Sequence, residues 1–324
     1  MMLLAGDIGG TKTTLALFTP EGGLEPRVQT SFKSNEYPSL AAVAARFLAE
    51  AGASVDRAVF GVAGPVTKGQ AMATNLPWVI TEAGLQDALG VPEVKLLNDL
   101  EATAYGVPNL PPGDLFALND TPVQSGTKAV VAPGTGLGEV VLFYQGGHFH
   151  VVPSEGGHAD FGPTSLLELE LLRDLMGKFG HVSYERVCSG KGIPNIYAFL
   201  KKNHFAEESP EMTEALRQAD DPTPIIVEKA MAGECELSIA TLNAFVSILG
   251  AEAGNLALKV MATGGLYLGG GIPPKILAKL RDGTLMASFV NKGRFAERLA
   301  RIPVYVILNQ QTALFGAACY GLGL

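Results

Sequence analysis

The chain opens with two apolar runs that are separated only by a glycine-rich turn. Residues 3–5 and 13–18 are predicted to be strands, and the segment between them reads "GDIGGTK". Because this segment is too short to contain a helix, the two strands are expected to pair directly as an antiparallel hairpin. The chain therefore begins with a β-hairpin whose tip holds an acid, three glycines and a threonine.

The residues of this first tip suit the binding of a phosphate group. Glycine permits positive φ and leaves backbone N–H groups accessible to an anion, and the Thr11 hydroxyl adds a donor. Asp7 stands where it could hold Mg²⁺ through water, because this ion keeps much of its hydration shell. The alternative is a tight hairpin in which the Asp7 side chain bonds its own backbone. The candidate phosphate-binding residues are Gly6, Asp7, Ile8, Gly9, Gly10 and Thr11.

A second tip of similar composition occurs in "KAVVAPGTGLGEVVLFY", again between two apolar runs. We interpret it as a weak internal repeat, so that two such hairpins facing each other would clamp a triphosphate from both sides. Neither tip has the Walker A pattern before a helix, and the β-rich run after the second tip argues against a dinucleotide fingerprint. The candidate phosphate-binding residues of this tip are Gly134, Thr135, Gly136 and Gly138.

A third glycine-rich stretch, "GGLYLGGGIP", reads as a short strand followed by a glycine turn. Without side chains in the way, an adenosine group could lie against this backbone. The alternative is a strand-to-helix turn that packs under a neighbouring element. The candidate adenosine-binding residues are Gly269, Gly270 and Gly271.

A set of polar residues suits a sugar, which needs both donors and acceptors and one carboxylate beside the reacting hydroxyl. Its members are Asn98, Asp99, Glu155, His158 and Glu185. Asn98 and Asp99 stand at a predicted strand–helix junction, and an aspartate near a phosphate-binding hairpin suits the role of base. The structural alternatives are a helix N-cap for Asp99, a hydrogen-bonded core histidine for His158 and a first-turn glutamate for Glu185.

Composition narrows the class of protein. With 324 residues, of which 47% are hydrophobic and 17% charged, the chain can build two domains with sizeable cores. The net charge of -8 argues against a broad nucleic-acid-binding face. Cys188, Cys235 and Cys319 lie far apart, which suggests neither a disulfide framework nor a zinc site. Because Asp7 comes too early for a signal peptide and no uncharged apolar stretch reaches about 18 residues, we expect a cytoplasmic protein without a membrane span.

The order of the predicted elements indicates α/β layers. Strands followed by crossover helices predict a mostly parallel sheet in each half of the chain. The stretch "VPNLPPGDLFAL" contains three prolines and is the expected crossing between the two halves.

Taken together, these motifs resemble those of the bacterial glucokinases, which belong to the superfamily of actin-like ATPases, sugar kinases and heat-shock chaperones. The glycine tips are shared across the superfamily, whereas "NDLEA", "EGGHADF" and "HVSYERVCSG" in this order are much more specific. The spelling "GGTK" is common in the related repressor–kinase group. That group carries a cysteine-rich zinc signature after its Gly-His, and "GGHADFGPTS" has no cysteine, which favours the non-zinc glucokinases.

The resemblance implies a two-domain actin-like ATPase (ribonuclease H-like) fold with a cleft between the domains. The small domain would hold residues 1–107 plus 303–324, and the large domain residues 108–302. The resemblance also makes the two tips the phosphate loops and the third glycine stretch the adenosine segment. It implies Asp99 as the catalytic base beside the sugar, with Asn98, Glu155, His158 and Glu185 as glucose ligands. "ATNLPW" resembles a sugar loop, which adds Asn75.

The implied activity is phosphorylation of the 6-hydroxyl of glucose with ATP and Mg²⁺. The nearest alternatives are a kinase for another hexose, such as mannose, fructose or an N-acetylated sugar, or one that uses polyphosphate as donor. A sugar-sensing regulator would need a DNA-reading helix-turn-helix, whereas this chain opens with a strand. A filament-forming or chaperone ATPase would not need the sugar-type polar set. A homodimer is the default expectation.

Overall fold

The computed structural model describes residues 1–73 and 75–324. The chain divides into two compact units, which we name the small unit and the large unit. The small unit consists of Met1–Pro112 and Asn309–Leu324, and the large unit consists of Gly113–Leu308.

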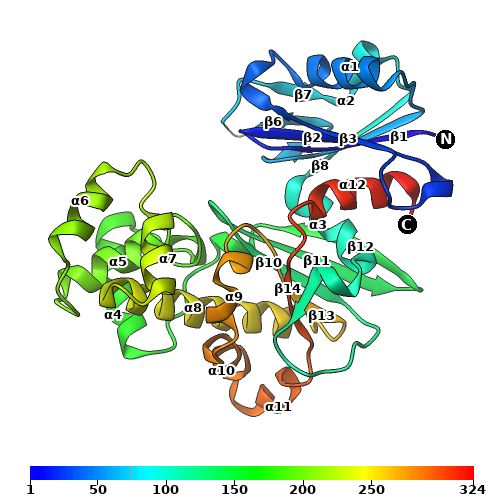
Figure 1. Cartoon of the computed structure of the whole chain (residues 1–324). Helices are drawn as coiled ribbons and strands as arrows, with labels where there is room; N and C mark the ends of the chain where they lie inside the picture. Colours follow the sequence, from blue (N-terminus) through cyan, green and yellow to red (C-terminus); the bar gives the residue numbers. More distant parts are fainter. Residues whose placement is uncertain (74) are drawn as a thin grey trace. The chain divides into compact units, whose positions relative to one another are not determined.

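The small unit contains a sheet with the strand order β3-β2-β1-β4-β8 (Figure 1). Its strands are β1 (Leu3–Ile8), β2 (Lys12–Phe18), β3 (Val28–Lys33), β4 (Arg57–Val62) and β8 (Glu93–Asn98). β1, β2 and β3 form an antiparallel meander, and β4 and β8 continue the sheet in parallel with β1. The hairpin predicted at the first glycine tip is confirmed. A separate small sheet holds β5 (Val66–Thr67), β6 (Gln70–Met72) and β7 (Val79–Thr81).

Helices cover both faces of the five-stranded sheet. They are α1 (Leu40–Ala51) and α2 (Glu82–Leu89) on one face, and α3 (Asp99–Gly106) and α12 (Thr312–Leu322) on the other (Figure 1). Successive side chains of a strand point to opposite faces. Leu4 of β1 accordingly lies in the core under α1 and α2, whereas Leu3 and Ala5 lie in the core formed with α3 and α12. Both faces of β1 are thus buried.

The large unit contains a sheet with the strand order β12-β11-β10-β13-β14-β9. Its strands are β9 (Leu115–Ala117), β10 (Lys128–Pro133), β11 (Leu137–Gln145), β12 (His148–Ser154), β13 (Gly265–Leu268) and β14 (Val304–Ile307). β10, β11 and β12 form an antiparallel meander, and β13 and β14 run parallel to β10. The edge strand β9 pairs antiparallel with β14.

Apart from the edge strand β9, the two sheets share one topology: a three-strand meander followed by two parallel strands added beside its first strand. This similarity confirms the internal repeat predicted from the two tips. The expectation of a mostly parallel sheet in each half is wrong. The short turns of the meanders leave no residues for a crossover helix, so these strands pair antiparallel.

The helices of the large unit surround one long buried helix, α8 (Glu236–Val260), which contacts α5, α7 and α10. The others are α4 (Leu166–Phe179), α5 (Ile193–Lys202), α6 (Pro210–Gln218), α7 (Thr223–Ala232), α9 (Leu277–Leu280), α10 (Thr284–Val290) and α11 (Ala296–Leu299). By length and composition alone α8 is apolar enough to cross a membrane, and 78% of its most apolar window is buried inside the unit. A helix that is apolar all round is typical of such a core position.

The strand β14 belongs to the large unit. It pairs with β13, so that Leu266 lies opposite Val304, and the chain enters the small unit only at Asn309. The small domain expected from the resemblance consists of residues 1–107 and 303–324, and its second segment includes this strand, which is hydrogen-bonded into the large unit's sheet. The helix α12, in contrast, packs on the small unit's sheet, where it contacts β1 and α3.

Candidate active site

The first tip lies at the carboxyl edge of the parallel strands β1, β4 and β8. The Gly9 N–H donates to the Lys12 carbonyl at 3.0 Å, and the Ser34 hydroxyl donates to the Gly9 carbonyl at 2.8 Å. The side chain of Thr11 is exposed. Gly6 lies inside β1, where an added Cβ would come within 2.6 Å of the Phe60 ring. The exposed part of this tip is therefore residues 9–12, and the glycine at position 6 is required by packing.

Two acids stand at this same edge. β8 is in register with β4 and β4 with β1, so the ends of the three strands lie side by side. Burial and the negative charge of Asp99 raise the pKa of Asp7 to about 6, and Lys12 opposes that shift. Burial also raises the pKa of Asp99, while hydrogen bonds from the Leu100 N–H and the Asn98 side chain lower it. A pair of partly buried carboxylates that repel each other is a donor set suited to Mg²⁺.

Asn98, and not Asp99, is the N-cap of α3. Its side-chain oxygen accepts a hydrogen bond from the Leu100 N–H at 3.0 Å, and its amide group donates to the Gly64 carbonyl at 3.0 Å. The Glu101 carboxylate accepts from the Asn98 N–H at 3.4 Å, which completes a capping box. The structural alternative, in which Asp99 is the N-cap, is therefore wrong by one residue. Asp99 is the first residue of α3, where the helix dipole favours its charge.

Asn75 lies in the exposed turn between β6 and β7, with φ of 63° in the left-handed region. Its neighbour Thr74 lies outside the described residues. Asparagine tolerates this backbone conformation better than most residues, so a turn role accounts for its presence as well as a ligand role does.

In the large unit, three candidate segments meet at the carboxyl edge of β10 and β13. The Gly134 N–H donates to the Gly136 carbonyl at 2.8 Å and closes the second tip. The Gly190 N–H donates to the Gly134 carbonyl at 2.7 Å. The adenosine candidates 269–271 follow β13, and the Ile272 N–H donates to the Pro133 carbonyl at 3.3 Å. The edge of parallel strands beyond their carboxyl ends is the usual ligand position in α/β folds.

Glu185 is bound directly to the second tip. It lies in a short 3₁₀ helix, η6 (Tyr184–Arg186), and its Oε2 accepts a hydrogen bond from the Leu137 N–H at 3.1 Å. A Cβ added at Gly136 would lie 2.4 Å from this oxygen, so any larger residue there would push the Glu185 carboxylate away. Glu185, a candidate sugar ligand, is therefore in direct contact with the second tip, a candidate phosphate-binding turn.

Glu155 precedes a second short helix, η5 (Gly156–His158), at the end of β12, and His158 is the last residue of that helix. Both side chains are exposed, with His158 Nε2 4.0 Å from Glu155 Oε2. Since His158 is exposed, its alternative as a core histidine is wrong. The segment is anchored to the rest of the site, because the Tyr184 N–H donates to the Ala159 carbonyl at 3.0 Å.

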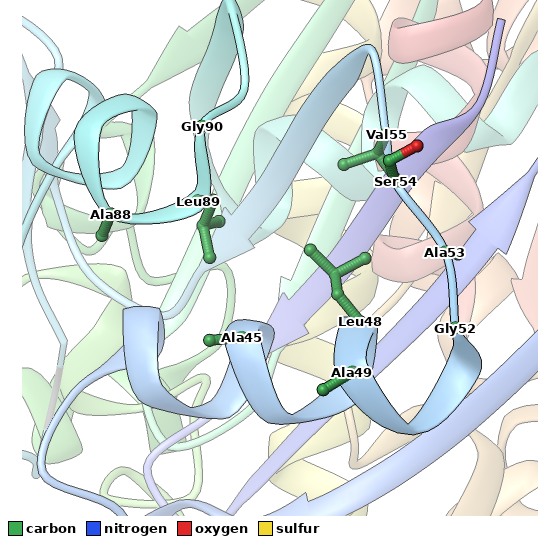
Figure 2. Close-up of a pocket in the computed structure, with 10 residues that line it drawn as sticks. All are labelled: Ala45, Leu48, Ala49, Gly52, Ala53, Ser54, Val55, Ala88, Leu89 and Gly90. Carbon is green, nitrogen blue, oxygen red and sulfur yellow. The ribbon is translucent and has the colours of Figure 1, made fainter.

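The candidate residues therefore form two groups. The small unit holds the first tip, Asp7, Asn75, Asn98 and Asp99, and the large unit holds the second tip, Glu155, His158, Glu185 and residues 269–271. A cavity of about 580 Å³ on the small unit contains none of them (Figure 2). It is lined by Ala45, Leu48 and Ala49 of α1 and by residues 52–55 and 88–90, and these groups are mostly aliphatic.

Two acids next to the large unit's group were missed by the sequence analysis. Glu139 on β11 and Glu252 on α8 are 2% and 0% exposed. The signal was a single acid in each of two strongly apolar segments, "GEVVLFY" and "LGAEAG". Buried acids are rare unless they are paired, so such positions merit attention.

A topology that occurs twice, with a glycine-tipped hairpin and carboxylates at the carboxyl edge of each sheet, defines a sugar kinase with the actin-like ATPase fold. The protein-family model described as "Glucokinase" matches residues 4–323. A glucokinase of Nostoc punctiforme is 42% identical, over 98% of this chain and 98% of its own. The chain belongs to the glucokinase family.

Solved structures agree with this assignment. The glucokinase of an Antarctic psychrotroph superimposes with a TM-score of 0.88 at 30% identity, over 100% of this chain and 99% of its own. A ROK family glucokinase from Streptomyces griseus, solved with glucose and AMPPNP, superimposes with a TM-score of 0.66 over 100% of both chains. At 20% identity it supports the fold alone. The family and the fold class predicted from the sequence are confirmed.

Proposed function

We propose that this chain transfers the γ-phosphoryl group of ATP to the 6-hydroxyl of glucose and so forms glucose 6-phosphate. The observation that carries the proposal is the hydrogen bond between Glu185 and the second glycine tip, because it joins a sugar-type ligand to a phosphate-type turn. Membership of the glucokinase family supports glucose as the acceptor. The relative solved with glucose and AMPPNP supports the pairing of this sugar with an ATP-type donor.

The two tips would bind the phosphates of ATP. Backbone N–H groups at residues 10, 11, 135 and 136, with the hydroxyls of Thr11 and Thr135, would supply donors to the transferring phosphoryl group. Preorganised donors of this kind stabilise the charge that develops in a phosphoryl-transfer transition state. The exposed backbone of Gly270 and Gly271 beside the second tip leaves space for the adenosine.

The glucose hydroxyls would be bound by Asn98, Glu155, His158 and Glu185, with Asn75 as a further ligand. Asp99 would accept the proton of the 6-hydroxyl. It is suited to this role because it is partly buried and is oriented by the hydrogen bond from Asn98 and by its place at the start of α3. General bases of this kind contribute about 10²–10⁴-fold in rate.

Asp7 would hold Mg²⁺ through water, with Asp99 contributing negative charge nearby. Burial and the negative charge of Asp99 both raise the pKa of Asp7, and a cation would relieve the repulsion between the two acids. The metal would supply neutralising charge to the phosphate oxygens. Cytoplasmic location and dimerisation stay predictions.

The experiment is a coupled assay of the purified chain with glucose, mannose, fructose and N-acetylglucosamine, each with ATP or polyphosphate. The proposal expects the highest kcat/KM with glucose and ATP. A higher kcat/KM with another hexose or with polyphosphate would show that this other sugar or donor is the preferred substrate. Absence of sugar phosphorylation in every combination would contradict a kinase function.

A further inference from the structure

Glu139 of β11 and Glu252 of α8 face each other in the interior of the large unit. Their exposed fractions are 2% and 0%, and the two carboxyl groups lie within hydrogen-bonding reach. Among residues 1–73 and 75–324, Oε1 of each carboxyl group finds no hydrogen-bond partner. Two buried carboxylates cannot both be charged at this separation without a large penalty. One proton on the pair would remove one of the two charges.

The groups around the pair fix its net charge. Lys259 Nζ lies 3.9 Å from Glu252 Oε1 and supplies one positive charge. Asn255 Nδ2 donates to Glu252 Oε2 at 2.9 Å and to the Tyr184 hydroxyl at 2.9 Å. A pair that carries one negative charge is therefore balanced by the positive charge of Lys259.

Two further ionisable groups face the pair. The buried Cys188 thiol has its pKa raised by burial and by the charges of Glu252 and Glu139. Lys292 donates from Nζ to the Ala251 carbonyl at 2.9 Å and interacts with the charge of Glu252, while burial lowers its pKa. Burial and the charge of Glu252 together raise the pKa of Glu139 to about 8.

The pair touches both segments that carry the large unit's sugar candidates. A Cβ added at Gly156 would lie 2.0 Å from Glu139 Oε2, so Glu139 lies against the segment that joins Glu155 to His158. On the other side, Asn255 links Glu252 to the Tyr184 hydroxyl by donating to both, and Tyr184 is the residue before Glu185. Both segments thus rest on one buried pair.

We propose that Glu139 and Glu252 share one proton and that this pair positions the segment from Glu155 to His158 and the Glu185 side chain for the sugar. The two acids are positioning residues, because they lie beneath the candidate ligands and do not reach the substrate. This inference rests on the proposed function.

Loss of the proton would place a second negative charge beneath Gly156. The sugar segment would then lose its support, while the donor site would be affected little. If only the protonated pair binds sugar, the midpoint near pH 8 implies that KM for glucose rises about tenfold between pH 7 and pH 9. KM for ATP should stay within about twofold over the same range.

The test compares Glu139→Gln with the parent, because glutamine still donates a hydrogen bond to Glu252 but does not titrate. We expect KM for glucose to stay within about threefold of the parent at pH 7 and to stay level up to pH 9. The matched control is Glu168→Gln, which changes another buried acid, bound to Thr164, and should keep the parent's pH profile. Parallel profiles for the parent and Glu139→Gln, or equal changes in both KM values, would overturn the proposal.

A second measurement does not depend on sugar binding. Glu139 is protonated in the folded protein up to pH about 8 but ionises near pH 4.5 in the unfolded chain. Its contribution to stability is therefore present below pH 4.5 and is lost between pH 4.5 and 8. The Tm of the parent relative to Glu139→Gln should fall from pH 5 to pH 8. A constant difference would contradict proton sharing, even if the chain proved to phosphorylate a different sugar.

Discussion

The Glu185 carboxylate accepts a hydrogen bond from the Leu137 backbone N–H over 3.1 Å, and Leu137 lies between Gly136 and Gly138 of the second tip. This contact couples the position of a sugar-type ligand to the conformation of a phosphate-type turn. Movement of either one would therefore disturb the other.

Gly136→Ala tests this coupling. The new methyl group would lie 2.4 Å from Glu185 Oε2, which forces the carboxylate away from the Leu137 N–H. We expect KM for glucose to rise about tenfold or more, the equivalent of about 1.4 kcal/mol of lost binding. Gly177→Ala in α4 is the control, because its added Cβ meets nothing within 4 Å. Steady-state kinetics that show no change for Gly136→Ala would rule out the coupling.

Glu155→Gln tests the sugar role of the segment after β12. Removing the charge of this exposed carboxylate should raise KM for glucose far more than KM for ATP, because the proposed contact is with the sugar alone. Asp160→Asn is the matched control, since Asp160 is an exposed acid in the same stretch whose partner is His181 at 2.8 Å. Equal changes in both constants for Glu155→Gln would remove this residue from the sugar site.

Asp7→Asn should increase the stability of the protein at pH 7 and at the same time weaken its use of Mg²⁺. The pKa of Asp7 is raised from 3.8 to about 6, so its ionisation destabilises the folded protein progressively as pH rises through this window. Without Mg²⁺, the variant should therefore have a higher Tm than the parent at pH 7 but not at pH 3.5. It should also require more Mg²⁺ for half-maximal activity. A lower Tm at pH 7 would show that the ionised Asp7 is stabilising.

Much of the fold followed from local pattern. The two tips were predicted as hairpins because no residues remained for a helix, and the same rule explains why neither sheet is mostly parallel. The cap of α3 was misplaced by one residue, because Asn98 and Asp99 are both favourable N-caps and only the backbone geometry distinguishes them. The boundary near residue 303 depended on which sheet β14 joins, a long-range pairing that its four residues do not encode.

The candidate site was predictable where its residues are close in sequence and not where folding brings distant segments together. The segments around Glu155 and Glu185 were each recognised, but their contact with the second tip is tertiary. The pair of Glu139 and Glu252 joins a strand to a helix more than a hundred residues away. The sequence alone indicates only that each acid stands in an apolar segment.

The most direct test of the central claim is the rate at which the parent and Asp99→Asn form glucose 6-phosphate from glucose and ATP, with glucose binding measured separately by calorimetry. We predict a loss of at least about 10²-fold in kcat for the variant, with the dissociation constant for glucose changed only a few-fold. A variant that turns over at the parent's rate would contradict the assignment of Asp99 as the base.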